Sequence, residues 1–210
     1  MQAPFEHLVT TVEELREELY PEPPAKAWAK EIDHLDEHCR DFIERSPIAF
    51  LGTSDAHGRC DVTPRGGPPG FARVLGPDRL AFADLTGNRR LDAFRNVLEN
   101  PQVGLVFLIP GLKETLRVNG RAYLTRDPDI LRVCDVPSRT ADVAFGVIVE
   151  TAFLHCAKAL IRSELWEPET WPASEELPSP AEILRDHVGS TSTVAEMEHE
   201  LSEAYSKRLW

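Results

Sequence analysis

Asn88-Arg89-Arg90-Leu91-Asp92 stands where a predicted strand, residues 79–84, turns through Leu85-Thr86-Gly87 into a predicted helix, residues 88–99. The first N–H groups of a helix lack backbone partners and carry partial positive charge. Two adjacent arginines at that point add permanently charged, fork-shaped donors, a combination that suits a terminal phosphate dianion. The alternative is an ordinary solvent-exposed helix start. The choice between a phosphate site and such a helix start depends on the rest of the chain.

Short apolar runs separated by turns lie on both sides of this unit. Turns such as Asp55-Ala56-His57-Gly58 and Pro110-Gly111 join neighbouring runs, which is typical of antiparallel pairs. About six short strands favour a mainly β fold, a six-stranded antiparallel barrel with helices at its ends. The strand patterns cover residues 48–52, 59–63, 71–75, 79–84, 103–109, 114–124 and 143–151.

Helical patterns flank the strands. Thr11-Val12-Glu13-Glu14 is a capping box that predicts a helix to about residue 20, and a second helix is predicted over residues 25–44. After the last strand, residues 152–163 are predicted to turn helical, residues 168–180 to form a surface excursion, and Thr193 to cap a final helix. The expected domains are a helical N-terminal extension, 1–46, a central domain, 47–166, and an acidic C-terminal extension with a terminal helix, 167–210.

The formal net charge of −12 argues against general nucleic-acid binding, which needs an excess of Lys and Arg. Residues 1–46 hold 12 acids and 5 bases, residues 167–210 hold 10 and 3, and residues 47–166 hold 13 and 15. Within the middle part, residues 59–95 contain seven arginines and four aspartates but no lysine or glutamate. This distribution predicts a local anion site in a protein that repels bulk polyanions.

Cysteine usage and hydropathy predict a cytoplasmic protein without membrane association. The four cysteines are scattered without a C-x-x-C pair, which favours reduced thiols over a disulfide framework or a zinc site. No apolar run approaches the roughly 20 residues needed to span a bilayer, and the N-terminus lacks the layout of a signal peptide. His34 and His38 are spaced like a pair of metal ligands, but without further ligands a solvated helix face is favoured and no metal is expected.

Two further motifs carry donors for a flat, anionic ligand. Asp61-Val62-Thr63-Pro64-Arg65-Gly66-Gly67 ends a strand with two glycines, so the backbone can approach a flat ligand closely while Arg65 donates to it; an ordinary β-turn is the alternative. In the run from His155 to Trp166, Lys158 and Arg162 would share a helix face and could grip one anion, and Trp166 offers a stacking surface. A basic amphipathic helix with a packed Trp is the alternative there.

The turn at residues 84–88 does not match the known nucleotide-binding loops. It has one glycine, which excludes the G-x-G-x-x-G dinucleotide fingerprint, and it is not a Walker loop.

Residues 47–166 resemble the FMN-binding split-barrel family related to pyridoxamine 5'-phosphate oxidase. The resemblance rests on residues 61–67, on 80–90 with its Gly-Asn-Arg-Arg, on Asn100-Pro101 with the strand after it, and on 116–122. The run from Cys156 to Trp166 is similar to a subgroup of uncharacterised FMN-dependent members. The family implies a six-stranded antiparallel split β-barrel, FMN as cofactor, and a homodimer that holds FMN in two clefts between its subunits.

The resemblance also implies a set of flavin contacts. Arg89 and Arg90 match the basic pair that binds the phosphate, with Asn88 beside them, and Asp84 matches contacts near the ribityl chain. Thr63, Pro64 and Arg65 match the strand along the isoalloxazine ring, and Thr115 a polar flavin contact. Lys158, Arg162 and Trp166 are assigned to the flavin of the other subunit. The implied cofactor-binding residues are therefore Thr63, Pro64, Arg65, Asp84, Asn88, Arg89, Arg90, Thr115, Lys158, Arg162 and Trp166.

The implied function is an FMN-dependent oxidoreductase, in which the protein supplies orientation and electrostatics. The chain lacks the C-terminal Arg-x-His segment and the Tyr…Arg…Ser set of the pyridoxamine phosphate oxidases, so pyridoxal phosphate synthesis is not expected. Two alternatives stay open: a non-catalytic flavin-binding or sensing protein with its acidic helices as a partner surface, and a deazaflavin-dependent reductase. The sequence identifies neither a catalytic residue nor the small-molecule substrate.

Overall fold

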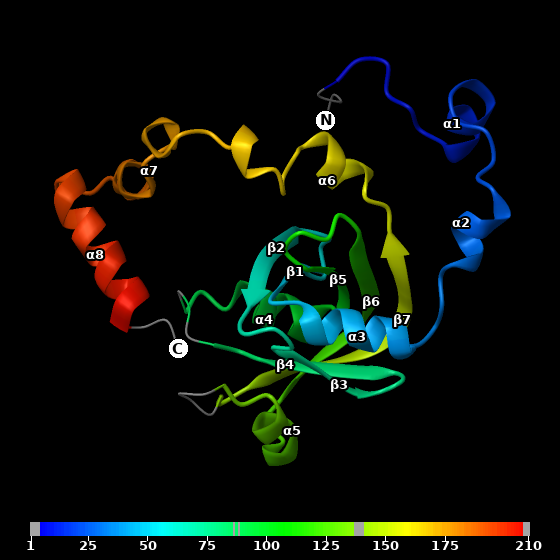
Figure 1. Ribbon diagram of the computed structural model, residues 1–210, viewed down its shortest axis with the longest axis horizontal. Coiled ribbons are helices and arrows are strands. Elements are labelled where there is room, and N and C mark those ends of the chain that lie inside the picture. The colour runs from blue at the N-terminus through cyan, green and yellow to red at the C-terminus, as the bar shows by residue number, and fades with distance from the viewer. Residues whose placement is uncertain (1–4, 86, 88, 137–140, 208–210) are drawn as a thin grey trace.

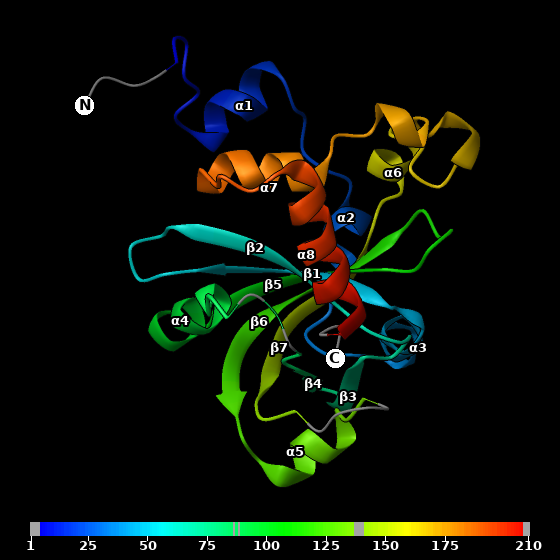
Figure 2. The same ribbon diagram turned by 90° about the vertical axis from the view of Figure 1, so that its left-hand side faces the viewer.

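The computed structural model describes residues 5–85, 87, 89–136 and 141–207. The strands of this described part form one antiparallel sheet in the order β2-β1-β5-β6-β7-β4-β3, and Figures 1 and 2 show that the sheet curves strongly. The strands are β1 Ile48–Ser54, β2 Cys60–Gly66, β3 Ala72–Gly76, β4 Arg79–Ala83, β5 Gln102–Leu108, β6 Thr115–Thr125 and β7 Ala144–His155.

A mainly β antiparallel fold with flanking helices is confirmed, but the count of six strands was wrong. The seven segments with a strand pattern all form strands of the 7-stranded sheet. The hairpin β3–β4 joins β7 through β4, which leaves β3 as one edge of the sheet and β2 as the other. Within the described residues these two edges do not pair, so the sheet is open rather than a closed six-stranded barrel.

One hydrophobic cluster fills the inner face of the sheet, the face defined by buried residues such as Leu51, Phe107, Val118 and Val147. These side chains alternate with more exposed ones along their strands, as period-2 geometry requires. The alternate positions form the outer face. Helices α3 (Glu37–Arg45) and α4 (Asp92–Glu99) add buried residues to the same cluster, so both are part of the core that positions the site.

The N-terminal helices differ from the prediction. The helix expected after Thr11 is confirmed as α1, Val12–Glu18, and the Thr11 side chain accepts from the N–H of Glu14. The single helix expected over residues 25–44 was wrong: the chain forms α2, Ala25–Ala29, and then α3. Between them Ile32 forms a bridge with Ala152 of β7, so tertiary pairing overrides the helical pattern there.

Two more helix predictions needed correction. The helix expected from residue 88 begins at Asp92, and Arg89 and Leu91 before it both have a φ of 61°. The helix expected over 152–163 is only α6, Lys158–Arg162, because β7 continues to His155 to complete its pairing with β6. In the described part of the chain, the α-helices not predicted are α5, Pro128–Val133, and α7, Pro180–Val188, and two short 3₁₀ helices, η1 Pro168–Thr170 and η2 Ser174–Glu176, were not predicted either.

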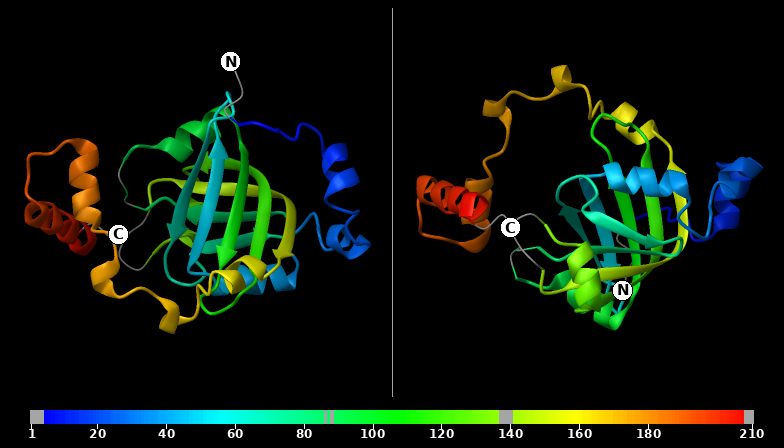
Figure 3. Two further views of the ribbon diagram at one scale, coloured as in Figure 1. Left: turned by 90° about the horizontal axis from the view of Figure 1, so that it is seen from above. Right: turned by 60° about the horizontal axis from the view of Figure 1, so that its bottom comes forward.

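The C-terminal part ends in a helical hairpin. Thr193 caps the final helix, α8, Val194–Lys207, as predicted: its backbone N–H donates to Glu196 Oε2 at 2.7 Å and its Oγ1 accepts from the Glu196 N–H at 3.3 Å. α7 and α8 pack on each other, and Figures 1 and 3 show this hairpin set apart from the sheet. No helix in the described part of the chain is long and apolar enough to cross a membrane.

Candidate functional site

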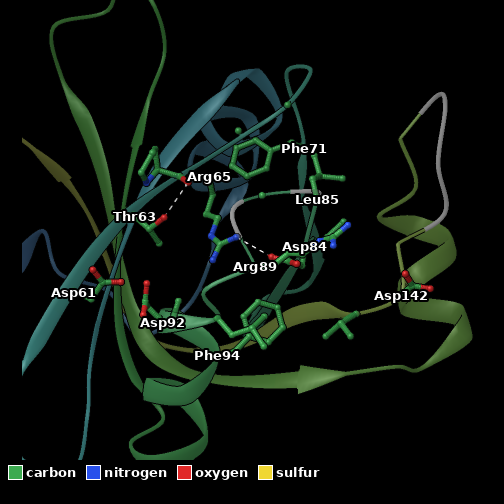
Figure 4. A pocket seen from close by; sticks show the side chains of 18 of the residues that line it. Asp61, Thr63, Arg65, Phe71, Asp84, Leu85, Arg89, Asp92, Phe94 and Asp142 are labelled. Atoms are coloured by element: carbon green, nitrogen blue, oxygen red, sulfur yellow. Dashed lines mark hydrogen bonds and ion pairs between the residues drawn. The ribbon is translucent and has the colours of Figure 1, made fainter. Parts of the chain in front are cut away.

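A cavity of about 960 Å³ opens between the end of β2, the end of β4 and the start of α4. Its size falls in the range of small-molecule sites. Figure 4 shows Arg65 pointing into it toward Asp84, with Asp61 and Thr63 on one side and Asp142 on the other. The lining residues are Asp61, Thr63, Pro64, Arg65, Gly66, Gly67, Pro68, Phe71, Ala83, Asp84, Leu85, Gly87, Arg89, Leu91, Asp92, Ala93, Phe94, Asp142 and Val143.

Arg65 is fixed inside the cavity by two contacts. Its Nη1 donates to Asp84 Oδ1 at 2.9 Å, and its guanidinium lies 5.1 Å from the centroid of the Phe145 ring. The two ion-paired side chains are 19% and 28% exposed, so the pair is largely shielded from solvent. The Nε atom of Arg65 is buried and has no partner among the described residues. A buried donor of this kind calls for an acceptor, which a bound ligand can provide.

The start of α4 is the second feature of the cavity. Its N-cap residue, Leu91, makes no side-chain capping bond. Thr11, Asp36 and Ser179 cap α1, α3 and α7 with their side chains. The first-turn residues of α4, from Asp92 to Phe94, line the cavity. The start of α4, where N–H groups lack backbone partners and carry partial positive charge, therefore borders a space in which an anion can bind.

The predicted arginine pair separates around this turn. Arg89 lines the cavity, whereas Arg90 is not among the lining residues. Arg90 Nε donates to Asp92 Oδ2 at 2.8 Å, and this hydrogen bond raises the pKa of Arg90. Asn88 lies outside the described residues. Thus Arg89 is the arginine placed to contact a ligand directly, and Arg90 lies next to it on the solvent side, 72% exposed.

Four aspartates face the same cavity as Arg65 and Arg89. Asp84 pairs with Arg65, and Asp92 pairs with Arg90. The sequence did not single out Asp61 or Asp142 as site residues. The spacing of Asp61, Thr63 and Arg65 along one strand, two residues apart, was the available signal that they share a face. Asp142 joins the site only through the pairing of β4 with β7, which no local pattern reveals.

Thr115, another predicted flavin contact, lies on the other face of the sheet from Thr63 and Arg65. Thr63 and Arg65 pair with Leu51 and Ala49, which are core residues, so they occupy the inner face. Thr115 precedes the buried Leu116 on β6 and therefore occupies the outer face. One chain thus places Thr115 on the side of the sheet opposite to the cavity.

The segment after β7 is also remote from the cavity lining. Lys158 and Arg162 are exposed at the two ends of α6, and no ion pair holds Arg162 in the described part of the chain. Trp166 donates from Nε1 to the carbonyl of Leu112 at 2.9 Å, which fastens it to the loop before β6. The prediction that these three residues contact a flavin of a second subunit remains a prediction.

The arrangement of the described residues gives no support to a metal site. These residues contain no cluster of three or more His, Cys, Asp or Glu side chains suited to a metal ion. His34 Nδ1 instead lies 2.9 Å from Asp33 Oδ1. Burial raises the pKa of the Cys39 thiol to about 11, so this thiol is a packing residue.

A family model described as pyridoxamine 5'-phosphate oxidase matches residues 35–151 of the chain, from the start of the α3 region to β7. The chain belongs to the pyridoxamine 5'-phosphate oxidase family. The match includes every residue that lines the cavity. A comparison with curated proteins finds no match.

Solved structures with a similar fold include three bacterial proteins. HupZ from Group A Streptococcus is 15% identical, with 57% of this chain and 92% of that chain covered and a TM-score of 0.47. General Stress Protein 26 from Bacillus anthracis is 14% identical, with 54% and 88% covered and a TM-score of 0.42. HutZ, a heme storage protein from Vibrio cholerae, is 18% identical, with 58% and 93% covered and a TM-score of 0.41.

Proposed function

We propose that this protein is an FMN-dependent oxidoreductase whose flavin occupies the cavity between β2, β4 and α4. The observation that carries the proposal is the uncapped start of α4, which opens with Arg89 on the same cavity as Arg65. A terminal phosphate fits the α4 start, since helix N–H groups and a guanidinium both bind dianions. The flat ring then lies along β2, beside Thr63, Pro64 and Arg65.

The residues of the cavity fit this cofactor. FMN, when bound, supplies hydride or electron transfer, while the protein supplies binding, orientation and electrostatics. Arg65 offers its unpartnered Nε–H to an acceptor on the ring, and this fixed, directed hydrogen bond stabilises negative charge on that acceptor. Asp84 holds Arg65 in that orientation through the 2.9 Å ion pair. Phe71 and Phe94 line the same cavity with apolar surface.

A homodimer with two flavin sites between its subunits is the second part of the proposal. The predicted flavin contacts Arg65 and Thr115 occupy opposite faces of one sheet, so a single chain cannot bring both to one ligand. A second copy can place its outer face against the cavity of the first. The exposed apolar residues on the strands, such as Phe50 (40%) and Val62 (67%), supply surface for such a contact.

The cofactor itself is the test of this proposal. The purified protein should show the absorbance of oxidised flavin, directly or after FMN is added, and mass spectrometry of the released cofactor should give FMN. A deazaflavin spectrum, FAD, or no binding after FMN addition contradicts the proposal. Turnover with NAD(P)H and an electron acceptor then separates an oxidoreductase from a flavin-binding sensor. Sedimentation of the loaded protein should give a dimer, and a monomer of 23.5 kDa contradicts the shared site.

A further inference from the structure

The α7–α8 hairpin has a very small core of its own. Its helices are 9 and 14 residues long, and among the described residues their buried side chains are Ala181 and Met197. Helices of this length are marginal in water unless an apolar face packs on another surface. Val188 of α7 and Tyr205 of α8 are instead exposed. The hairpin therefore requires a further surface that covers its apolar side chains.

The segment before the hairpin holds it away from the chain's own sheet. Trp166 donates to the carbonyl of Leu112 at 2.9 Å, and Lys113 Nζ lies 2.7 Å from Glu167 Oε1, so the start of this segment is fixed to the loop before β6. Residues 168–180 contain four prolines, and proline-rich chain is extended and semi-rigid. Figures 1 and 3 show the hairpin standing clear of the sheet beyond this segment. This arrangement favours a second molecule as the surface that covers the hairpin.

A groove of about 570 Å³ lies between the start of α7 and α8. Ala181, Leu201 and Tyr205 line it with apolar surface, and Glu198 adds a carboxylate. No ion pair holds Glu198 in the part of the chain that the structure describes. Residues 167–210 hold ten acids and three bases, so the surroundings of the groove are negative as well. The groove thus suits an apolar side chain that has a cation beside it.

The exposed side of α4 offers this combination. Leu98 is 75% exposed, and Arg95, three residues earlier, lies on the same side of the helix. Arg95 is exposed, and no ion pair involves it among the described residues. The opposite side of α4 packs into the core through Ala93 and Val97. The helix belongs to residues 47–166, where bases outnumber acids by 15 to 13, whereas both ends of the chain are acidic.

We propose that the α7–α8 hairpin of one copy docks on the exposed side of α4 in a second copy. Leu98 of the second copy enters the groove, and Arg95 beside it pairs with Glu198. In a two-fold dimer the contact is reciprocal and is made twice. The hairpin lies outside residues 35–151, which match the family model, so the contact is an addition to the family fold. Neither Arg95 nor Leu98 lines the cavity, and the contact does not require that the cavity hold FMN.

Cross-linking of the full-length protein tests the contact. The exposed thiols Cys60 and Cys156 are first replaced by serine. In that background, Leu98→Cys/Ser202→Cys treated with a short bis-maleimide should run as a covalent dimer on a denaturing gel, because Ser202 lines the groove. Each single-cysteine variant should remain monomeric on the same gel. The matched control is Ile161→Cys/Ser202→Cys, since Ile161 is also exposed on a basic helix, α6, and this pair should give little covalent dimer. The result should be the same with and without added FMN.

A charge exchange tests the pairing of Arg95 with Glu198. Arg95→Glu, added to the double-cysteine protein, should lower the yield of covalent dimer at least about fivefold, because two negative charges then meet. Adding Glu198→Arg should restore the yield. Glu200→Arg, on the same helix but outside the groove lining, should not restore it.

Three results would overturn the proposed contact. The first is no more covalent dimer in the double-cysteine protein than in the single-cysteine variants or in the α6 control. The second is a cross-link within one chain, which would mean that the hairpin folds onto its own α4. The third is a yield that Arg95→Glu leaves unchanged. Because the cross-link is read with and without FMN, failure of the proposed flavin site leaves this outcome unaffected.

Discussion

Arg65 and Arg117 occupy similar positions on opposite faces of one sheet. Each guanidinium lies over a phenylalanine ring, Arg65 at 5.1 Å from the centroid of Phe145 and Arg117 at 5.0 Å from that of Phe153. Arg65 also binds the carboxylate of Asp84, whereas no acidic side chain in the described part of the chain pairs with Arg117. The inner arginine is therefore fixed and charge-balanced, and the outer one retains uncompensated charge.

This difference separates two uses of a basic residue. A charge-balanced arginine adds little net potential but offers a fixed, directed donor, which suits the ring of a flavin. An uncompensated arginine attracts an anion directly and is weakly fixed until one binds. The same comparison applies at α4, where Arg90 is paired with Asp92 and Arg89 faces the cavity.

The largest effect is expected at the start of α4. Arg89→Ala with Arg90→Ala should weaken FMN binding by about 2–5 kcal/mol, since charge-assisted hydrogen bonds contribute roughly 1.5–3 kcal/mol each and need not be additive. Fluorescence titration of the flavin measures the change. The control is Arg95→Ala, because Arg95 is exposed on the same helix and does not line the cavity. Its FMN binding free energy should stay within about 0.5 kcal/mol of wild type. An unchanged affinity in the double variant would place the phosphate elsewhere.

The two ring-bound arginines should differ in their effect on stability. Arg65→Gln should lower the free energy of unfolding by about 1–3 kcal/mol, because it removes the 2.9 Å ion pair between Arg65 and the largely shielded Asp84. Arg117→Gln removes a charge that has no acidic partner among the described residues, so it should leave the free energy of unfolding within about 0.5 kcal/mol of wild type or raise it. Denaturant unfolding of both variants measures these free energies. Equal losses of unfolding free energy in the two variants would contradict the claim that only Arg65 is held by an ion pair.

Much of the sheet could be predicted from the sequence because its strands alternate and are bounded by local turns. Every predicted strand segment became a strand, and the capping boxes at Thr11 and Thr193 correctly marked two helix starts. The count and closure of the barrel could not be predicted, because they depend on which edges pair. The break between α2 and α3 was missed for the same reason, since Ile32 pairs with Ala152 of a distant strand.

The candidate site was predictable in part. Thr63, Pro64, Arg65, Asp84 and Arg89 were predicted and do line one cavity. The Arg65–Asp84 pair joins residues 19 positions apart, which composition cannot reveal. Lys158 and Arg162 were predicted to share one face of a helix, but that helix is only five residues long. Their spacing is therefore weaker support for joint binding of one anion than the sequence suggested.

A moderate effect is expected at α6. Arg162→Ala should lower flavin affinity by about 1–3 kcal/mol, the range for a lost charged hydrogen bond, if this arginine contacts the flavin of a second subunit. The melting temperature of the apo protein should change little, because Arg162 is exposed and has no ion pair among the described residues. A lower apo melting temperature with unchanged flavin affinity would instead indicate a structural role.

The smallest effect concerns His155 and pH. Its pKa in the folded protein is lowered from 6.5 by burial and then by Arg117 and Lys30, so the unfolded chain takes up a proton more readily. The folded state should therefore lose stability as the pH falls below about 6.5, and His155→Gln should show less of this loss. Denaturant unfolding of both proteins across this range measures the difference. Parallel curves would show that His155 titrates normally.

The central claim is that the flavin phosphate binds at the start of α4, and comparison of FMN with riboflavin tests it most directly. Riboflavin has the same ring and ribityl chain but no phosphate. Wild-type protein should bind FMN at least about 100-fold more tightly, a difference of roughly 2.7 kcal/mol. In Arg89→Ala/Arg90→Ala this preference should shrink to a few-fold, with riboflavin affinity nearly unchanged. Equal affinity of wild type for the two flavins, or a preference that survives in the double variant, would contradict the account.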